Sequence, residues 1–339
     1  MNFQLDQSET VSQGFQRVVL EQVDDLLIQL ADPALPPDLV VHSTRKSLKR
    51  LRAVLRLARF AIGDEVYALE RDRYRDIGRQ LSEIRDSAVR IETIDDLIAD
   101  AGPSHTYETL RGDLVDAHKT LSQELFEREH IFDKVAADLR EGRALVHTWT
   151  DLPNDFSAIR LGLRKVYSRG RADFEAARTN PTTEQLHAWR KFTKHLWYQT
   201  QLLLQIHPDY LQPLATALDA LADYLGKDHD LANQSAIVKD SGVGHALSAR
   251  RARMQRRAIQ LGKTVYREAP DELNARFEIY FRVWRGDLAP AAVAAFNPWP
   301  DPDPADDLAD DEADAELAAA SSPSAATPEL RDAGRVDPS

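Results

Sequence analysis

The sequence predicts an all-α protein in which one helical unit occurs twice. Apolar residues recur at helical spacing along most of the chain, and few runs alternate as a half-buried strand would. A His-x-x-Arg-Lys-x-x-Lys motif begins at His42 and again at His187, with every basic residue in register. With 43% hydrophobic residues over 339 positions, the chain has enough apolar side chains for a packed core.

Proline, glycine and capping residues separate the helices of the first half. We expect helices over residues 8–31, 37–61, 64–100 and 104–148. The breaks between them are Asp-Pro, Pro-Pro, Gly-Asp and Ala-Gly-Pro-Ser, at residues 32–33, 36–37, 63–64 and 101–104. An Asp-Leu-Pro-Asn-Asp segment at 151–155 then interrupts the chain between the two motif copies.

The second half follows the same helical pattern. We expect helices over residues 155–179, 183–206, 209–239, 242–269 and 271–289. The threonines at 182 and 183 offer an N-cap to the helix that carries the second motif. Because a duplicated basic face suggests that the halves meet around one site, we expect a single domain over 8–295, with halves of about 8–150 and 155–295.

The negative charge of the chain is concentrated at its C-terminal end. From residue 297 onward there are twelve acidic and two basic residues, which account for −10 of the net charge of −12 and leave −2 for residues 1–296. Segment 297–339 is rich in Asp, Ala, Pro and Ser and has few large apolar residues, so we expect a disordered acidic tail. The chain has no cysteine, which excludes disulfides and thiolate metal sites.

Each motif copy places a cationic stripe beside an apolar one. In the first copy the cationic stripe consists of His42, Arg45, Lys46, Lys49, Arg52 and Arg56. In the second copy it consists of His187, Arg190, Lys191 and Lys194, while Trp197 and Gln201 replace the last two arginines. No acidic residue lies within either helical stretch to offset this charge. We therefore expect both stripes to bind an anion, and the first to contribute more charge.

Further basic residues could extend these stripes. A third helix places Arg160, Arg164, Tyr167, Arg171 and Arg178 within one stripe at helical spacing, and we expect this stripe to attract an anion as well. Weaker candidates are Arg50 and His195 within the motifs, and Arg79 and Arg85 after the first motif. For Arg85, a structural pair with Asp86 or another acid is an equally good interpretation.

These residue types suit phosphate. Arginine offers a planar bidentate fork and lysine a compact charge, and the stripes hold few of the aromatic side chains on which single-stranded nucleic acids stack. No carboxylate shares a stripe with His42 or His187, so we expect these histidines to hydrogen-bond phosphate or support the helix rather than hold a metal. Neighbouring cations should lower the pKa of both rings. No cofactor is expected.

The order of these motifs resembles that of the CHAD family, the conserved histidine α-helical domain, over residues 8–295. The resemblance is carried by the two His-x-x-Arg-Lys runs, by Leu-Ser-Glu-Ile-Arg-Asp at 81–86, by Leu-Gly-Lys-Asp-His-Asp at 225–230 and by the basic stretch 164–171. It implies two four-helix bundles related by a pseudo-twofold axis, whose basic helices line a cationic cleft and bind inorganic polyphosphate. Because the sequence shows no complete catalytic constellation, we expect this binding to occur without catalysis. It also implies an association with polyphosphate granules.

Two other functions stay open from the sequence. Asp228-His229-Asp230 could belong to a metal-dependent phosphohydrolase acting on phosphate polymers or nucleotides, although the other histidines form no recognisable ligand set. A nucleic-acid-binding helical protein is the second alternative, and we expect nucleic acid to bind weakly if at all. The N-terminus lacks the features of a secretory signal and no apolar run is long enough for a membrane span, so a cytoplasmic protein without a membrane partner is expected.

Overall fold

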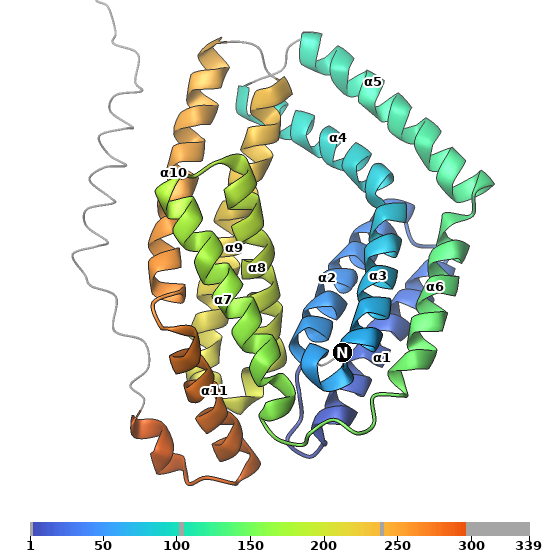
Figure 1. Cartoon of the computed structure of the whole chain (residues 1–339). Helices are drawn as coiled ribbons and strands as arrows, with labels where there is room; N and C mark the ends of the chain where they lie inside the picture. The colour runs from blue at the N-terminus through green and yellow to red at the C-terminus, as the bar shows by residue number, and fades with distance from the viewer. Residues whose placement is uncertain (1–2, 102–104, 238–240, 296–339) are drawn as a thin grey trace, which may run out of the picture. The chain divides into compact units, whose positions relative to one another are not determined.

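The computed structural model describes residues 3–101, 105–237 and 241–295, and over these residues the chain is all-α, with no strand (Figure 1). The predicted fold class is confirmed for this part of the chain. The predicted acidic tail, 297–339, lies outside the described residues. None of the described helices combines the length and hydropathy that a membrane crossing requires.

The first half forms a four-helix bundle with a helical hairpin attached. Its helices are α1 (Val11–Ala31), α2 (Pro37–Ile62), α3 (Asp64–Gln80), α4 (Ser82–Ala101), α5 (His105–Ser122) and α6 (Ile131–Val146), with a π turn at Gln123–Arg128. Helix α1 packs on α2, α2 on α3, α3 on α6 and α6 on α1, which closes the bundle. Helices α4 and α5 pair with each other outside this ring.

The second half has a bundle of the same kind. Its helices are α7 (Ser157–Thr179), α8 (Thr183–Leu202), α9 (Pro208–Ile237), α10 (Ser241–Val265) and α11 (Pro270–Arg285), with 3-10 turns at Leu204–Ile206 and Pro290–Ala295. The packing runs from α7 to α8, α9, α10 and back to α7, while α11 lies against α7. The pseudo-twofold relation between the bundles stays a prediction.

Two of the predicted helices of the first half are interrupted. The predicted helix 64–100 is divided at Leu81, which separates α3 from α4. The predicted helix 104–148 is broken by the π turn and by His130, whose φ of 52° is left-handed. Neither break contains the glycine or proline that marks most boundaries, so the sequence pattern did not reveal them. The predicted threonine cap is confirmed, because the Thr182 side chain accepts a hydrogen bond from the Gln185 amide.

The two motif helices meet at the contact between the halves. Helix α2 packs against both α7 and α8. Gly162 of α7 lies so close to α2 that a Cβ atom there would stand 2.0 Å from the Leu57 carbonyl oxygen, which requires glycine. Between α8 and α2, the buried Gln199 amide donates to the Ala53 carbonyl at 3.1 Å. The backbones of the halves are therefore in direct contact beside the two basic stripes.

Candidate functional site

Packing of α2 presents its cations on the surface. Leu48, Leu51 and Leu55 are buried on its apolar side. On the other side His42, Lys46 and Lys49 are exposed, and Arg45, Arg52 and Arg56 are half-buried. Among the described residues, no acidic group lies within ion-pair distance of these six cationic or titratable side chains. The structure therefore keeps the first stripe together and leaves its charge uncompensated at short range.

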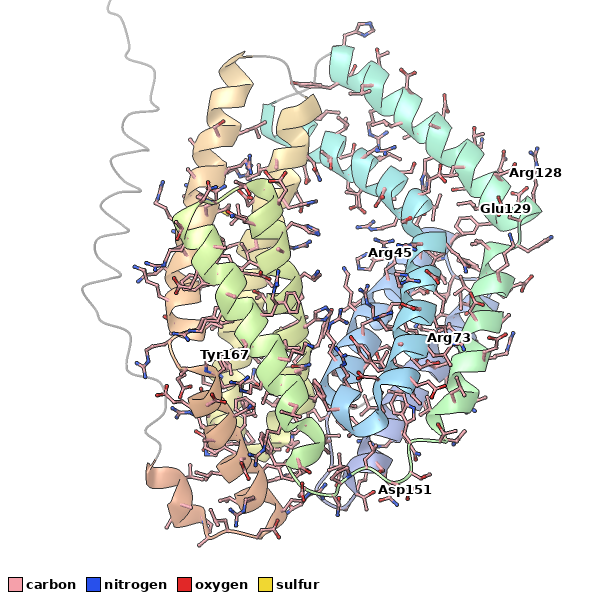
Figure 2. The ribbon with its side chains drawn as sticks, viewed as in Figure 1. Arg45, Arg73, Arg128, Glu129, Asp151 and Tyr167 are labelled. Carbon is pink, nitrogen blue, oxygen red and sulfur yellow. The ribbon has the colours of Figure 1, made fainter. Side chains whose placement is uncertain are left out.

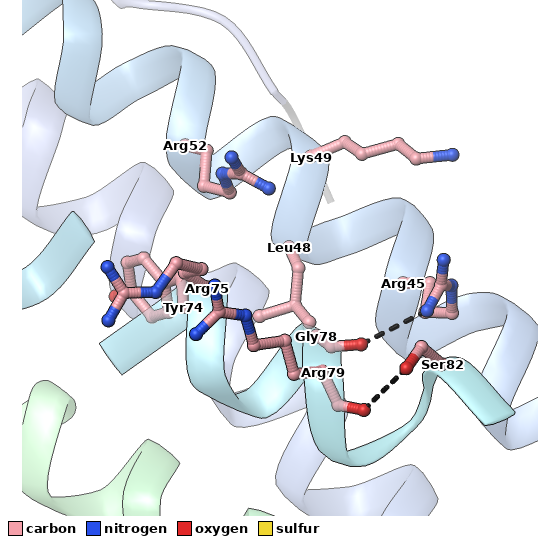
Figure 3. Close-up of a pocket in the computed structure, with 9 residues that line it drawn as sticks. All are labelled: Arg45, Leu48, Lys49, Arg52, Tyr74, Arg75, Gly78, Arg79 and Ser82. Carbon is pink, nitrogen blue, oxygen red and sulfur yellow. Dashed lines mark hydrogen bonds between the residues drawn. The ribbon is translucent and has the colours of Figure 1, made fainter. Parts of the chain in front are cut away.

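A pocket of about 280 Å³ opens between α2 and α3 (Figure 3). Its lining residues are Arg45, Leu48, Lys49 and Arg52 of α2, Tyr74, Arg75, Gly78 and Arg79 of α3, and Ser82 of α4. Arg45 is fixed by donating to the Gly78 carbonyl oxygen at 3.1 Å. Arg75 lies 2.7 Å from Asp72 and 2.9 Å from Asp76, and Arg79 lies 3.5 Å from Asp76. Three cations without an ion pair thus share one pocket with two that are paired on their own helix.

Lys49 joins the stripe of α2 to that of α8. Part of its surface is accessible, yet protein surrounds the ammonium on most sides. This desolvation, followed by the nearby charges of Arg190, Arg45 and Lys194, lowers the pKa of Lys49 to about 8. Figure 3 shows Lys49 reaching out from α2 on the side away from α3. The two motif copies therefore converge at Lys49.

His195 lies buried beside the same convergence. Burial lowers the pKa of its ring well below the ordinary value, and the charges of Arg56, Arg52 and Lys191 lower it further. Neither ring nitrogen has a hydrogen-bond partner among the described residues. The ring is therefore neutral, and it packs between cations of α2 and α8 instead of adding a charge of its own.

The two motif histidines have lowered pKa values, as predicted, but the larger cause is burial. For His42 the charges of Arg85 and Lys49 follow burial, and for His187 the neighbouring His229 and Arg190 do so. The rings of His187 and His229 lie 5.4 Å apart. No described carboxylate hydrogen-bonds either motif ring. The geometry thus offers two neutral imidazoles that become better anion ligands when protonated.

Two cations of the third predicted stripe are paired with acids of α11, so the charge of this stripe is partly offset. Arg160 pairs with Glu278, and Arg164 lies 2.6 Å from Asp271, because α11 packs on α7 and brings distant acids to it. Tyr167 is buried and donates to the Glu268 carbonyl, and Arg171 donates to the Tyr266 carbonyl at 3.1 Å. Figure 2 places Tyr167 within the second bundle, apart from Arg45. The structure does not bring these residues to Lys49.

Of the other candidate residues, Arg85 and Arg50 are held by contacts within the fold, whereas Arg79 lines the α2–α3 pocket. Arg85 forms two hydrogen bonds with Glu92, at 2.9 and 3.2 Å, so its alternative as part of a structural pair is confirmed. Arg50 donates to Gln22 of α1 and lies over the ring of Phe3, which precedes α1 in the chain. Arg79 remains at the α2–α3 pocket, with 71% of its side chain exposed.

The second half has a pocket of its own, which the sequence analysis did not find. It lies between α8 and α9 and is lined by Trp197, Gln201, Gln212, Ala215, Thr216, Asp219, Ala220 and Asp223. The Lys194 ammonium stands 3.5 Å from Asp219 and 4.4 Å from the centre of the Trp197 ring. Asp223 pairs with Lys227 at 2.8 Å. The charge of the second stripe is therefore partly neutralised from α9.

Of the three residues that suggested a metal-dependent hydrolase, Asp228 has a structural role in the fold. Asp228 is buried and accepts hydrogen bonds from Arg251 at 3.1 Å and Gln255 at 2.8 Å. Both of these bonds reach one carboxylate oxygen, and a longer bond from Arg251, at 3.4 Å, reaches the other. Across the described ranges, no three His, Asp or Glu side chains are grouped so that they could hold a metal ion.

A family model for the CHAD domain matches residues 15–239, and the chain belongs to that family. This match contains both motif copies, the α2–α3 pocket and the helices that form the second pocket. A comparison with curated proteins finds no match to the chain.

Proposed function

We propose that the protein binds inorganic polyphosphate at the surface where α2 and α8 converge, by electrostatic attraction and without hydrolysing it. The observation that carries the proposal is Lys49, which stands among Arg45, Arg190 and Lys194 with no described acid in ion-pair distance. The proposed contacts are His42, Arg45, Lys46, Lys49, Arg52, Arg56, Arg75 and Arg79 from the first half and His187, Arg190, Lys191 and Lys194 from the second.

Desolvation makes these cations good partners for a polyanion. Burial lowers the pKa of Arg52 and Arg56, and neighbouring cations lower it further. Charges held together in this way repel one another in the free protein, and a bound anion relieves that repulsion. Guanidinium groups also form bidentate, charge-assisted hydrogen bonds with phosphate oxygens. The family membership is consistent with a phosphate polymer as the ligand.

Aromatic stacking has little part in this site, which favours polyphosphate over single-stranded nucleic acid. Tyr198 is buried, and the Trp197 ring already lies under the Lys194 ammonium. Proteins that bind single strands without sequence preference combine a basic groove with exposed aromatic platforms. We therefore propose that nucleic acid binds more weakly than polyphosphate of equal charge.

Binding without chemistry is supported by the surroundings of the histidines. A general base works best when a third group orients it, and neither motif ring has a carboxylate in hydrogen-bond distance among the described residues. In a cell, a protein of this kind would act in the cytoplasm and associate with polyphosphate granules.

A titration at fixed salt tests the proposal. We expect long polyphosphate to bind more tightly than short polyphosphate, and nucleic acid of equal charge to bind least. Repeating the titration over a salt series should give a steep linear fall of log affinity with log salt, because bound phosphates release counterions. A flat salt dependence, or phosphate release in proportion to protein concentration, would contradict the proposal.

A further inference from the structure

The helices that follow the two motifs carry opposite charges at equivalent positions. If Leu81 and Leu225 are taken as equivalent, Arg75 and Arg79 of α3 correspond to Asp219 and Asp223 of α9. Burial follows the same register in both helices. The buried residues that correspond are Tyr74, Ile77, Leu81 and Ile84 in the first half and Leu218, Leu221, Leu225 and Asp228 in the second. Helices α3 and α9 therefore carry opposite charges at positions that correspond in their pattern of burial.

The two pockets differ accordingly. Arg75 and Arg79 line the pocket between α2 and α3, and Asp219 and Asp223 line the pocket between α8 and α9. On the motif helices, Arg52 of the first pocket corresponds to Trp197 of the second. A phosphoryl group is attracted to the first pocket, whereas the lining of the second offers it two carboxylates and no cation. Among the described pockets that the duplicated helices form, one is thus suited to a concentrated negative charge.

The cations are not spread evenly along the proposed binding surface. Five of them line the α2–α3 pocket, whereas His187 and Lys191 stand exposed along α8. Figure 3 shows Arg52, Arg75 and Arg79 gathered towards one end of the pocket and Arg45 towards the other. Leu48 and Tyr74, both buried, also line the pocket. The pocket therefore surrounds a bound group with donors from two helices.

A polyphosphate chain carries its most concentrated charge at its ends. Each internal phosphate has one acidic oxygen, but the terminal phosphate has a second ionisation. That ionisation resembles the one of a phosphate monoester, with a pKa near 6, so the terminal group holds about −1.5 to −2 at pH 7. It also presents three oxygens as hydrogen-bond acceptors. The densest group of cations matches this terminal group better than an internal unit.

We propose that the α2–α3 pocket binds the terminal phosphoryl group of a polyphosphate chain, and that the chain then passes over Lys49 to Arg190 and Lys191 of α8. The inference rests on the proposed function and adds to it the place where an end of the chain binds. Arg45, Lys49 and Arg52 supply charge that no described acid offsets at ion-pair distance. Arg75 and Arg79 add donors while Asp72 and Asp76 hold them in place. The two ends of the chain are chemically alike, and the carboxylates of Asp219 and Asp223 make the α8–α9 pocket a poor second site for either end.

Chains of one length with free and blocked ends test this inference. The probe is linear polyphosphate whose two terminal groups have been converted to phosphoramidates, compared with the unmodified chain by calorimetry at fixed salt. We expect the full-length protein to bind the free-ended chain about tenfold more tightly, since the blocked end loses a charge and one charge-assisted contact. Equal affinities for the two chains would overturn the inference while leaving the proposed function intact.

Variants then test whether the α2–α3 pocket causes the preference for free ends. Arg79→Gln, at a mostly exposed side chain, and Arg75→Gln should each reduce the preference for free ends. Arg190→Gln with Lys191→Gln should weaken both chains by the same factor and keep the preference. A preference that survives in Arg75→Gln/Arg79→Gln would place the end elsewhere and refute the pocket assignment. If the unaltered protein binds neither chain, the proposed function itself fails, and circular dichroism shows whether each variant is folded.

Discussion

Reversing two lysines on each motif helix should reveal which half of the site binds more strongly. In Lys46→Glu/Lys49→Glu the changes fall on α2, where the first pocket and the convergence lie. In Lys191→Glu/Lys194→Glu they fall on α8, where Asp219 already offsets Lys194 at 3.5 Å. The two variants change the net charge equally, so each serves as the control for the other.

The expected magnitudes follow from these surroundings. A lysine beside an anionic surface contributes about 1 kcal/mol, and reversing its charge adds repulsion. For the first pair we expect a loss of about 2–3 kcal/mol, or roughly 30- to 150-fold in affinity. For the second pair we expect about 1–2 kcal/mol, or roughly 5- to 30-fold, because the Lys194 charge is partly neutralised in the free protein.

The assay is a titration with long polyphosphate at several salt concentrations, with melting temperatures measured in parallel. Each lost phosphate contact should also reduce the slope of log affinity against log salt by about 0.9, by analogy with DNA. Melting temperatures should hardly change, since surface substitutions usually alter stability by within about 0.5 kcal/mol. A larger loss from the α8 pair would refute the reasoning, and unfolding of both variants would mean that the stripes are structural.

Three further outcomes are expected. Polyphosphate should raise the pKa of Lys49 from about 8, so the contribution of Lys49 to affinity is full below pH 8 and falls as the pH rises above it. Calorimetry near pH 8, in buffers of different ionisation enthalpy, should detect proton uptake by Lys49, and Lys49→Arg should abolish this uptake. Asp219→Asn should free Lys194 and strengthen polyphosphate binding about two- to fivefold, whereas Asp223→Asn, with the same change of charge, should have less effect. Gly162→Ala should destabilise the fold by about 1–3 kcal/mol in denaturant unfolding, because its Cβ meets the Leu57 carbonyl; Gly112→Ala, which meets nothing within 4 Å on α5, should be neutral or stabilising.

The sequence predicted the helices of both bundles because their apolar periodicity and punctuation are strong. It missed the breaks at Leu81 and His130, where the interruption depends on packing and not on glycine or proline. The first cationic stripe was predictable because its residues lie on one helix. The compensation of Arg164 by Asp271 was not, since helical spacing reports acids on the same helix and says nothing of those brought by α11.

The acidic pocket of the second half could have been found from the sequence. Aligning Leu81 with Leu225 places Arg75 opposite Asp219, which shows the reversal of charge directly. The motif helices alone do not contain this difference. The convergence at Lys49 needed the structure, because it depends on how α2 lies against α8.

The contact at Gly162 affects how the charge of the proposed binding surface can change through substitution. Because the backbone of α7 rests directly on that of α2, the spacing of the halves is set by main-chain atoms and not by the exposed side chains. Substitutions on the outer faces can then alter the electrostatic potential without moving the helices that carry it. The difference between Arg75 and Asp219 is an example within one molecule: the two halves keep the same helical frame, while the pockets beside their motif helices carry side chains of opposite charge.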